Sequence, residues 1–158
     1  MNENVAYLVE KFKLKPHPEG GFYSETYRAT KSDNGRSWST GIYFLLGRGD
    51  ISHLHRIDSD EMWHFYSGDP LKIIEIDEDG KLVETILGTN YKDGMVSQYT
   101  VKAGRWFGSL PVEGSEYCFV GCTVSPGFEF SSFELAKREE MSSQYPEYKD
   151  LMTQVCIN

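Results

Sequence analysis

Apolar and polar residues alternate along most of the chain between residues 21 and 136. Such alternation over short segments is typical of strands with one buried face. The alternating segments are rich in aromatic and β-branched side chains, which favour pleated strands over helices. The pattern predicts strands in GFYSETYR, STGIYFLL, EMWHFYSG, LKIIEID, KLVETILG, SQYTVKAG, EYCFVGCTV and FEFSSFELA.

The two ends of the chain follow a helical period instead. Near the start, apolar residues recur at spacings of three and four until KPHPEGG ends the pattern with two prolines and a glycine pair. Near the other end, Pro146 suits the first turn of a final helix. The apolar positions of these two predicted helices are Val5, Leu8, Val9 and Phe12, and then Tyr148, Leu151, Met152 and Val155.

The order of these segments predicts the fold class. Many short strands with turn residues between them favour an all-β fold, a jelly-roll β-barrel with short N- and C-terminal helices. Asp79-Gly80 lies between two of the strands and is a strong hairpin signal. The length of 158 residues is near the commonest size for one domain, and no repeat or linker interrupts it, so we expect a single domain over residues 1–158.

The overall charge argues against one class of partner. The chain has 16 basic and 24 acidic residues, which gives a formal net charge of -8. Binding a nucleic-acid backbone requires a basic face, so we expect no nucleic-acid partner. No apolar run approaches the roughly 20 residues that a bilayer crossing needs, so we expect no membrane association either.

The N-terminal sequence and the cysteines favour a cytoplasmic protein. The start, MNENVAYLVEKF, lacks the long apolar core of a secretory signal. The three cysteines are odd in number and show no CxxC spacing. Cys118 and Cys122 would lie about 13 Å apart along one strand, which is too far for a disulfide. We therefore expect small buried free cysteines.

The segment GRGDISHLHRIDSDEMWHFYSG, residues 47–68, holds three of the four histidines. His53 and His55 are two residues apart, so a strand would direct both imidazoles to one face. With Glu61 from a neighbouring strand they would form a His-His-Glu cluster in the mouth of a barrel. Such a cluster can bind a divalent first-row metal, transfer protons or only form hydrogen bonds, and the sequence leaves these alternatives open.

This segment closely resembles the first motif of the cupin superfamily, whose members are small jelly-roll barrels. The usual motif has three or four residues before its glutamate, whereas this chain has five, so either Glu61 is displaced by one position or Asp60 takes its place. The second cupin motif normally supplies a histidine as the fourth metal ligand, and this chain has Phe107 there. The resemblance therefore implies at most three protein ligands, His53, His55 and Glu61, if a divalent metal is bound.

The resemblance extends over nearly the whole chain to one particular cupin family. That family is functionally uncharacterised and is grouped near the dTDP-4-dehydrorhamnose epimerase-like cupins. The resemblance implies a small-ligand-binding barrel in which His53 or His55 acts as a general base and a tyrosine returns the proton. The segments that carry it are HPEGGFYSETYR, TGIYFLL, RIDSDEMWHFYSGDPL, VKAGRWFGSL and CTVSPGFEFSSFELAKREE, and the candidate tyrosines are Tyr43, Tyr99 and Tyr117.

A nucleotide ligand would need aromatic faces for its base and arginines for its phosphates. Arg56 directly follows His55 within the motif, and its alternative role is a surface ion pair with Asp58 or Asp60. His17, between two prolines, is expected to be an ordinary loop residue. The predicted ligand-binding residues are Arg56, Trp63, Phe65, Tyr43, Gln98, Trp106, Phe107 and Tyr117, with Arg28 and Arg105 as further guanidinium groups.

These patterns predict a protein that binds a nucleotide or nucleotide-sugar in its barrel and that, if catalytic, is a sugar epimerase or isomerase. The alternatives are a metal-dependent dioxygenase or isomerase and a non-catalytic binding module. The segment FYSETYR carries aromatic or apolar residues on both faces. Pairing with a second subunit would cover both faces, so we expect a homodimer.

Overall fold

Eleven strands form the body of the protein in the computed structural model, which describes all residues from 1 to 158. The strands are β1 (Lys15–Pro16), β2 (Phe22–Arg28), β3 (Thr40–Gly47), β4 (Ser52–Arg56), β5 (Asp60–Gly68), β6 (Leu71–Ile76), β7 (Leu82–Leu87), β8 (Gln98–Val101), β9 (Trp106–Pro111), β10 (Tyr117–Ser125) and β11 (Glu134–Leu135).

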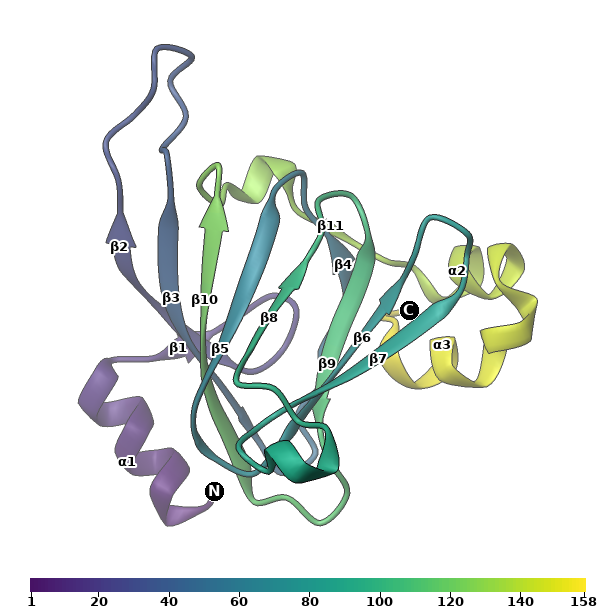
Figure 1. Ribbon diagram of the computed structural model, residues 1–158, viewed down its shortest axis with the longest axis horizontal. Helices are drawn as coiled ribbons and strands as arrows, with labels where there is room; N and C mark the ends of the chain where they lie inside the picture. Colours follow the sequence, from purple (N-terminus) through teal and green to yellow (C-terminus); the bar gives the residue numbers. More distant parts are fainter.

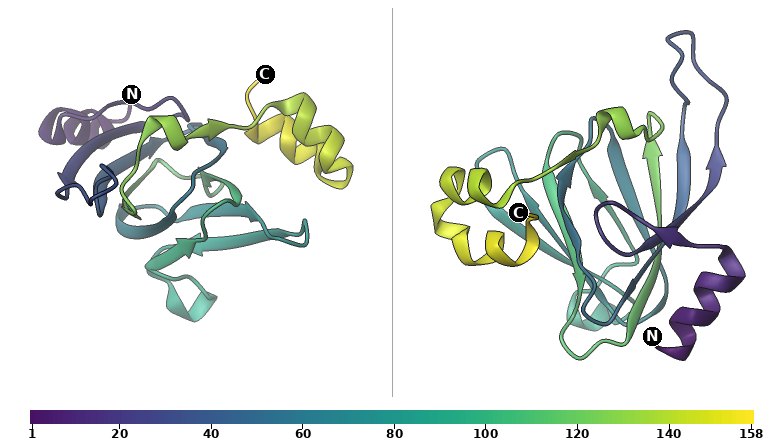
Figure 2. Two further views of the ribbon diagram at one scale, coloured as in Figure 1. Left: turned by 90° about the horizontal axis from the view of Figure 1, so that it is seen from above. Right: turned by 180° about the vertical axis from the view of Figure 1, so that it is seen from behind.

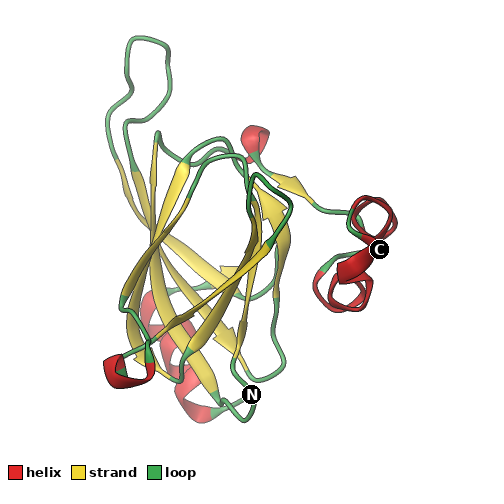
Figure 3. Cartoon of the chain, turned by 45° about the vertical axis from the view of Figure 1, so that its right-hand side comes forward, coloured by secondary structure: helices red, strands yellow, loops and turns green.

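The strands form two antiparallel sheets that face each other across the core (Figures 1 and 3). One sheet has the order β1-β2-β3-β10-β5-β8 and the other has the order β11-β4-β9-β6-β7. The chain passes repeatedly from one sheet to the other, as in a jelly roll, which confirms the predicted fold class. The predicted hairpin at Asp79-Gly80 joins β6 to β7, and Gly80 has the positive φ of 77° that the turn requires.

Three α-helices lie outside the sheets, and three short 3-10 helices occur in the connections (Figure 2). The first helix packs beside β3, whereas the last two pack together behind β4, on the other side of the molecule. No helix has both the length and the apolar character needed to cross a membrane. The helices are α1 (Glu3–Phe12), α2 (Arg138–Gln144) and α3 (Lys149–Val155), with η1 (Tyr91–Asp93), η2 (Phe130–Ser132) and η3 (Pro146–Tyr148).

The buried apolar residues form three clusters, and each follows from the alternation along the strands. The main cluster lies between the two sheets and includes Phe44, Trp63 and Phe107. A second cluster lies between the five-stranded sheet and the C-terminal helices and includes Leu54 and Met152. A third lies under α1. Successive residues of one strand thus pack on opposite faces of the sheet.

The predicted strand FEFSSFELA is mostly irregular, and this prediction was wrong for residues 128–133. The segment forms η2 and then only the two-residue strand β11. Phe128, Phe130 and Phe133 pack against one another with ring centroids 5.0–6.1 Å apart. The three rings therefore form an aromatic cluster at the end of the barrel. The packing of this cluster outweighs the local preference of the segment for a strand.

Candidate functional site

A cavity of about 270 Å³ lies inside the barrel, enclosed by strands of both sheets and by two connecting segments. Buried polar side chains line its interior, and exposed charged side chains mark its opening. The walls between them are aromatic and aliphatic. The lining residues are Lys15, His17, Glu19, Tyr23, Glu25, Arg28, Thr40, Ile42, His55, Ile57, Glu61, Cys122, Val124, Phe128, Glu129 and Phe130.

The buried carboxyl group of Glu19 links the loop before β2 to strand β4. Ser52 donates a hydrogen bond from Oγ to Oε1 of Glu19 over 3.0 Å, and Nε2 of His55 lies 3.0 Å from Oε2. These two partners are three residues apart on β4. They reach the same carboxyl because the pairing of β4 with β9 is irregular between Ser52 and His55.

The hydrogen bonds of His55 fix the position of its proton. Nδ1 lies 2.7 Å from the carbonyl oxygen of His53, which only accepts, so Nδ1 carries the hydrogen. Burial lowers the pKa of His55 to about 3, and burial also raises the pKa of Glu19, with the nearby Glu61 adding to the increase. The pair is therefore neutral, and the carboxylic acid of Glu19 donates to Nε2 of His55.

His17 is a second neutral imidazole with a defined tautomer. Its Nδ1 accepts the backbone N–H of Glu19 over 3.1 Å, so Nε2 carries the ring hydrogen, and Nε2 has no hydrogen-bond partner in the protein. Burial lowers the pKa of His17 to about 4. Aromatic rings surround this imidazole, with centroids 4.6–6.4 Å away: Tyr23, Phe44, Phe128, Phe130 and Phe133.

Glu61 is the carboxyl group of the cavity without a hydrogen-bond partner. Its side chain comes from β5, where Glu61 is paired with Val124 of β10, and the residue is only 8% exposed. Burial raises its pKa to about 8. A carboxyl group in such surroundings exchanges a proton near neutral pH, so Glu61 can act as an acid or as a base toward a bound molecule.

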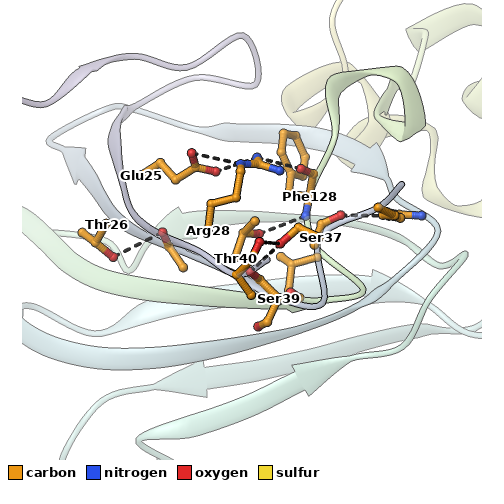
Figure 4. A network of polar contacts seen from close by, with 12 residues as sticks. Glu25, Thr26, Arg28, Ser37, Ser39, Thr40 and Phe128 are labelled. Atoms are coloured by element: carbon orange, nitrogen blue, oxygen red, sulfur yellow. Dashed lines mark hydrogen bonds and ion pairs between the residues drawn. The ribbon is translucent and has the colours of Figure 1, made fainter. Parts of the chain in front are cut away.

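The opening of the cavity is held by a polar network around Arg28 (Figure 4). The guanidinium donates to Glu25 over 2.6 Å and to the carbonyl oxygen of Phe128 over 3.0 Å. The backbone N–H of Phe128 in turn donates to Oγ1 of Thr40 over 2.9 Å. This network fixes the segment after β10 to strands β2 and β3. That segment carries Phe128 and Phe130, which form the aromatic wall of the cavity.

Two of the three residues predicted as a His-His-Glu cluster line the cavity. His55 and Glu61 do so, whereas His53 lies outside the lining, with Nδ1 2.8 Å from the carbonyl oxygen of Glu19. Phe107, at the position of the usual fourth ligand, packs on the ring of His55 at 4.2 Å. Trp63 is buried in the core, 6.4 Å from Phe107 between ring centroids.

Of the other predicted ligand-binding residues, Arg28 lines the cavity at its opening, and the rest lie outside the lining. Arg56 pairs with Glu134 and stacks on Trp106, instead of pairing with the aspartates considered above. Gln98 is exposed and contacts His64. Phe65, Tyr43 and Tyr117 are half-buried against the core clusters.

The remaining candidate side chains form a separate structural network at the far strands of the barrel. Tyr99 donates its hydroxyl hydrogen to the fully buried Glu75, and Arg105 bridges Glu75 and Glu78. This network joins β8 of one sheet to β6 of the other. None of its members lines the cavity.

Sequence reasoning did not identify His17, Glu19 or the aromatic wall as site residues. The sequence feature that could have indicated a role for His17 and Glu19 is the glycine pair that follows them, Gly20-Gly21. A side chain at Gly20 would place its Cβ 2.0 Å from the carbonyl oxygen of Ile51, and Gly20 has φ of 112°. The glycine therefore permits a close backbone approach that brings the loop against β4.

The residues of the cavity do not fit the metal centre that the cupin motif implies. No group of three His, Cys, Asp or Glu side chains is close enough to hold a metal ion. Both ring nitrogens of His55 are already engaged, by Glu19 and by the carbonyl oxygen of His53. The cavity therefore presents carboxyl and imidazole groups that can donate and accept protons, and not a set of metal ligands.

Comparisons with known proteins agree with this architecture. Residues 6–136 match the family model described as Cupin superfamily (DUF985). An uncharacterized protein of Saccharomyces cerevisiae is 28% identical over 156 residues, which cover 87% of this chain and 77% of the relative.

Solved structures extend the comparison. A Shewanella oneidensis protein is 37% identical with a TM-score of 0.92, and 99% of each chain is covered. A hypothetical protein from Leishmania major is 34% identical with a TM-score of 0.87, covering 97% of this chain and 98% of that one. Oxalate decarboxylase from Bacillus subtilis, at 15% identity and a TM-score of 0.59, covers 89% of this chain and 36% of its own, and shares the fold alone.

Proposed function

The chain belongs to the cupin superfamily (DUF985), and from this premise we propose that it binds a nucleotide or nucleotide-sugar with the ring end of the ligand inside the barrel. The observation that carries the proposal is the cavity itself. It combines an aromatic wall with hydrogen-bonding groups that the protein leaves without partners. Its volume of about 270 Å³ is just below the roughly 300–1,000 Å³ of typical ligand sites, which suits one ring better than a whole nucleotide.

The interior favours a ring that is polar but uncharged. The pair formed by Glu19 and His55 is neutral, and His17 presents one N–H group. Tyr23 and Phe128 supply faces on which a flat ring can stack. A free phosphate group would lose its hydration here without gaining a cation, so phosphates belong outside the interior.

The opening of the cavity provides cations for phosphates. Lys15 lines the opening and takes part in no ion pair, and Arg28 lies on the neighbouring strand. Both residues are exposed. A ligand with its ring inside would therefore extend its phosphates toward these two side chains, and Arg28 is suited to a bidentate contact.

Thermal unfolding tests this proposal. We expect thymidine diphosphate and thymidine-diphosphate glucose to raise the melting temperature in a concentration-dependent manner, because a ligand that binds only the folded state stabilises it. The panel should also contain the uncharged nucleoside and the diphosphates of the other common bases. If no member of the panel stabilises the protein, the proposal fails.

The Arg28→Gln variant tests the placement of the phosphates. We expect the affinity for the diphosphate to fall roughly tenfold or more, since a charge-assisted hydrogen bond is lost, while the affinity for the nucleoside stays within about twofold. Calorimetric titration measures both. Arg48→Gln is the matched control because Arg48 pairs with Glu116 away from this cavity. Equal weakening of both ligands would mean that Arg28 acts only through the aromatic wall.

A further inference from the structure

The cavity contains two unpartnered groups that are complementary in proton transfer. We infer that Glu61 and His17 form a base and an electrophile for removing a proton next to a carbonyl group of the bound ligand. This inference rests on the proposed function, since it requires a ligand to occupy the cavity. It assigns the acid–base chemistry to two residues of which only Glu61 belongs to the cupin motif.

The hydrogen bonds of His55 prevent it from acting as the general base. Its Nδ1 donates to the carbonyl oxygen of His53, and its Nε2 accepts from Glu19. A general base needs a free lone pair within hydrogen-bond reach of the ligand. Neither nitrogen of His55 offers one, so His55 acts as a support that holds Glu19 in place.

Glu61 satisfies the requirement that His55 does not. No donor of the protein contacts its carboxyl oxygens, and the residue lines the cavity while being only 8% exposed. The titratable groups that interact electrostatically with Glu61 are Glu19 and Cys122. Burial raises the pKa of both, so both are neutral. An ionised Glu61 therefore has no cation in the cavity interior to stabilise it, which strengthens it as a base.

His17 supplies the complementary group. Because Nδ1 accepts the backbone N–H of Glu19, the neutral ring presents Nε2–H, which has no partner in the protein. A neutral imidazole that donates to a carbonyl oxygen can stabilise the enolate formed from it. The surrounding aromatic rings hold the imidazole in one orientation.

The step balances without a further reactant. Glu61 takes the proton from the carbon next to the carbonyl, and the electron pair of the C–H bond becomes the new C=C bond. The carbonyl π pair moves onto oxygen, which receives a hydrogen bond from Nε2 of His17. Glu61 then exchanges this proton with solvent and returns a solvent-derived proton to the same carbon, so the hydrogen of the C–H bond is replaced.

Deuterium exchange tests the inference directly. Dihydroxyacetone and a thymidine-diphosphate 4-keto sugar are incubated with the protein in D2O, and loss of the C–H signal next to the carbonyl is followed by proton NMR. Saturation-transfer NMR on the same samples reports whether each probe is bound. We expect bound probe to exchange, and Glu61→Gln to slow the exchange at least ~100-fold while binding persists.

Further variants separate chemistry from folding. His17→Phe keeps an aromatic ring within the surrounding rings and removes the donor, so we expect roughly 100-fold slower exchange. Glu61→Asp retains a carboxyl group but moves it away from the ligand by one methylene. The exchange rate of this variant tests the role of Glu61 if Glu61→Gln fails to fold. Glu113→Gln, an exposed residue outside the cavity lining, is the matched control and should exchange at the wild-type rate.

The outcomes distinguish the two proposals. A bound probe that exchanges no faster than in buffer, or equally fast with Glu61→Gln, overturns the inference and leaves the binding function standing. If neither probe binds, the inference also fails. The binding function fails with it only if the nucleotide panel gives no thermal stabilisation.

Discussion

Glu61 is a buried carboxyl group that lines the cavity. Its pKa is about 8 in the folded protein, because burial disfavours the charged carboxylate, whereas an unfolded chain would hold it near the ordinary value of about 4.3. Between these two values the folded protein retains a proton that the unfolded chain has released. The contribution of Glu61 to stability is therefore lost as the pH rises through this window.

The Glu61→Gln variant should lack this loss. We expect the unfolding free energy of the variant, relative to wild type, to rise by up to about 1.4 kcal/mol per pH unit between roughly pH 5 and 8. Urea denaturation at several pH values measures it. Glu113→Gln, exposed and outside the cavity lining, should follow the wild type. If Glu61→Gln and wild type show the same pH dependence, Glu61 titrates as an ordinary exposed carboxyl group.

At the residue scale, the sequence could predict that His55 and Glu61 share a site, because the motif and strand alternation both indicate it. It could not predict the exclusion of His53 from the cavity lining. That outcome depends on the irregular pairing of β4 with β9, which brings Ser52 and His55 to one carboxyl group. A local irregularity of this kind leaves no periodic signal in a single sequence.

At the scale of elements, β4 connects the cavity to the C-terminal helices. Leu54 packs on the helix side of the sheet, and its neighbour His55 faces the cavity. Met152 of α3 is fully buried in the cluster that contains Leu54. The helices therefore support the strand that carries His55, the partner of Glu19.

Shortening Met152 should weaken this support. We expect Met152→Ala to lower the unfolding free energy by about 2–5 kcal/mol, because it removes apolar contacts and leaves a cavity. Urea denaturation measures the loss. Gln154→Ala, on the exposed side of the same helix, is the control and should change stability by less than about 0.5 kcal/mol. Similar small effects of both variants would show that α3 is not part of the cooperative core.

The first and last helices and most strands were predictable at this scale because each has a clear hydrophobic period, which α2 lacks. The segment after β10 was not, since Phe128 and Phe130 have the two-residue spacing of a strand but pack, together with Phe133, around His17. Their partner lies more than a hundred residues earlier in the chain. Local patterns carry no information about such a contact.

At the scale of the whole molecule, the jelly roll assembles the cavity from distant parts of the chain. The loop before β2, strands β4 and β5, and the segment after β10 each contribute side chains. The hydrophobic pattern predicts the barrel, but for the two segments that complete its open end it predicts a plain loop and a strand. The predicted homodimer remains a proposal, which equilibrium sedimentation can test.

Methyl NMR shows whether a ring-containing ligand occupies this cavity. The isoleucine and valine methyl groups are labelled, and thymidine-diphosphate glucose is titrated into the protein. Ile42, Ile57 and Val124 line the cavity, whereas Ile74 and Ile76 pack toward the C-terminal helices and serve as internal controls. We expect saturable shifts at the three cavity residues and none at the controls. Unchanged cavity methyl groups across the full nucleotide panel, or shifts confined to other regions, would mean that the ligand does not bind in this cavity.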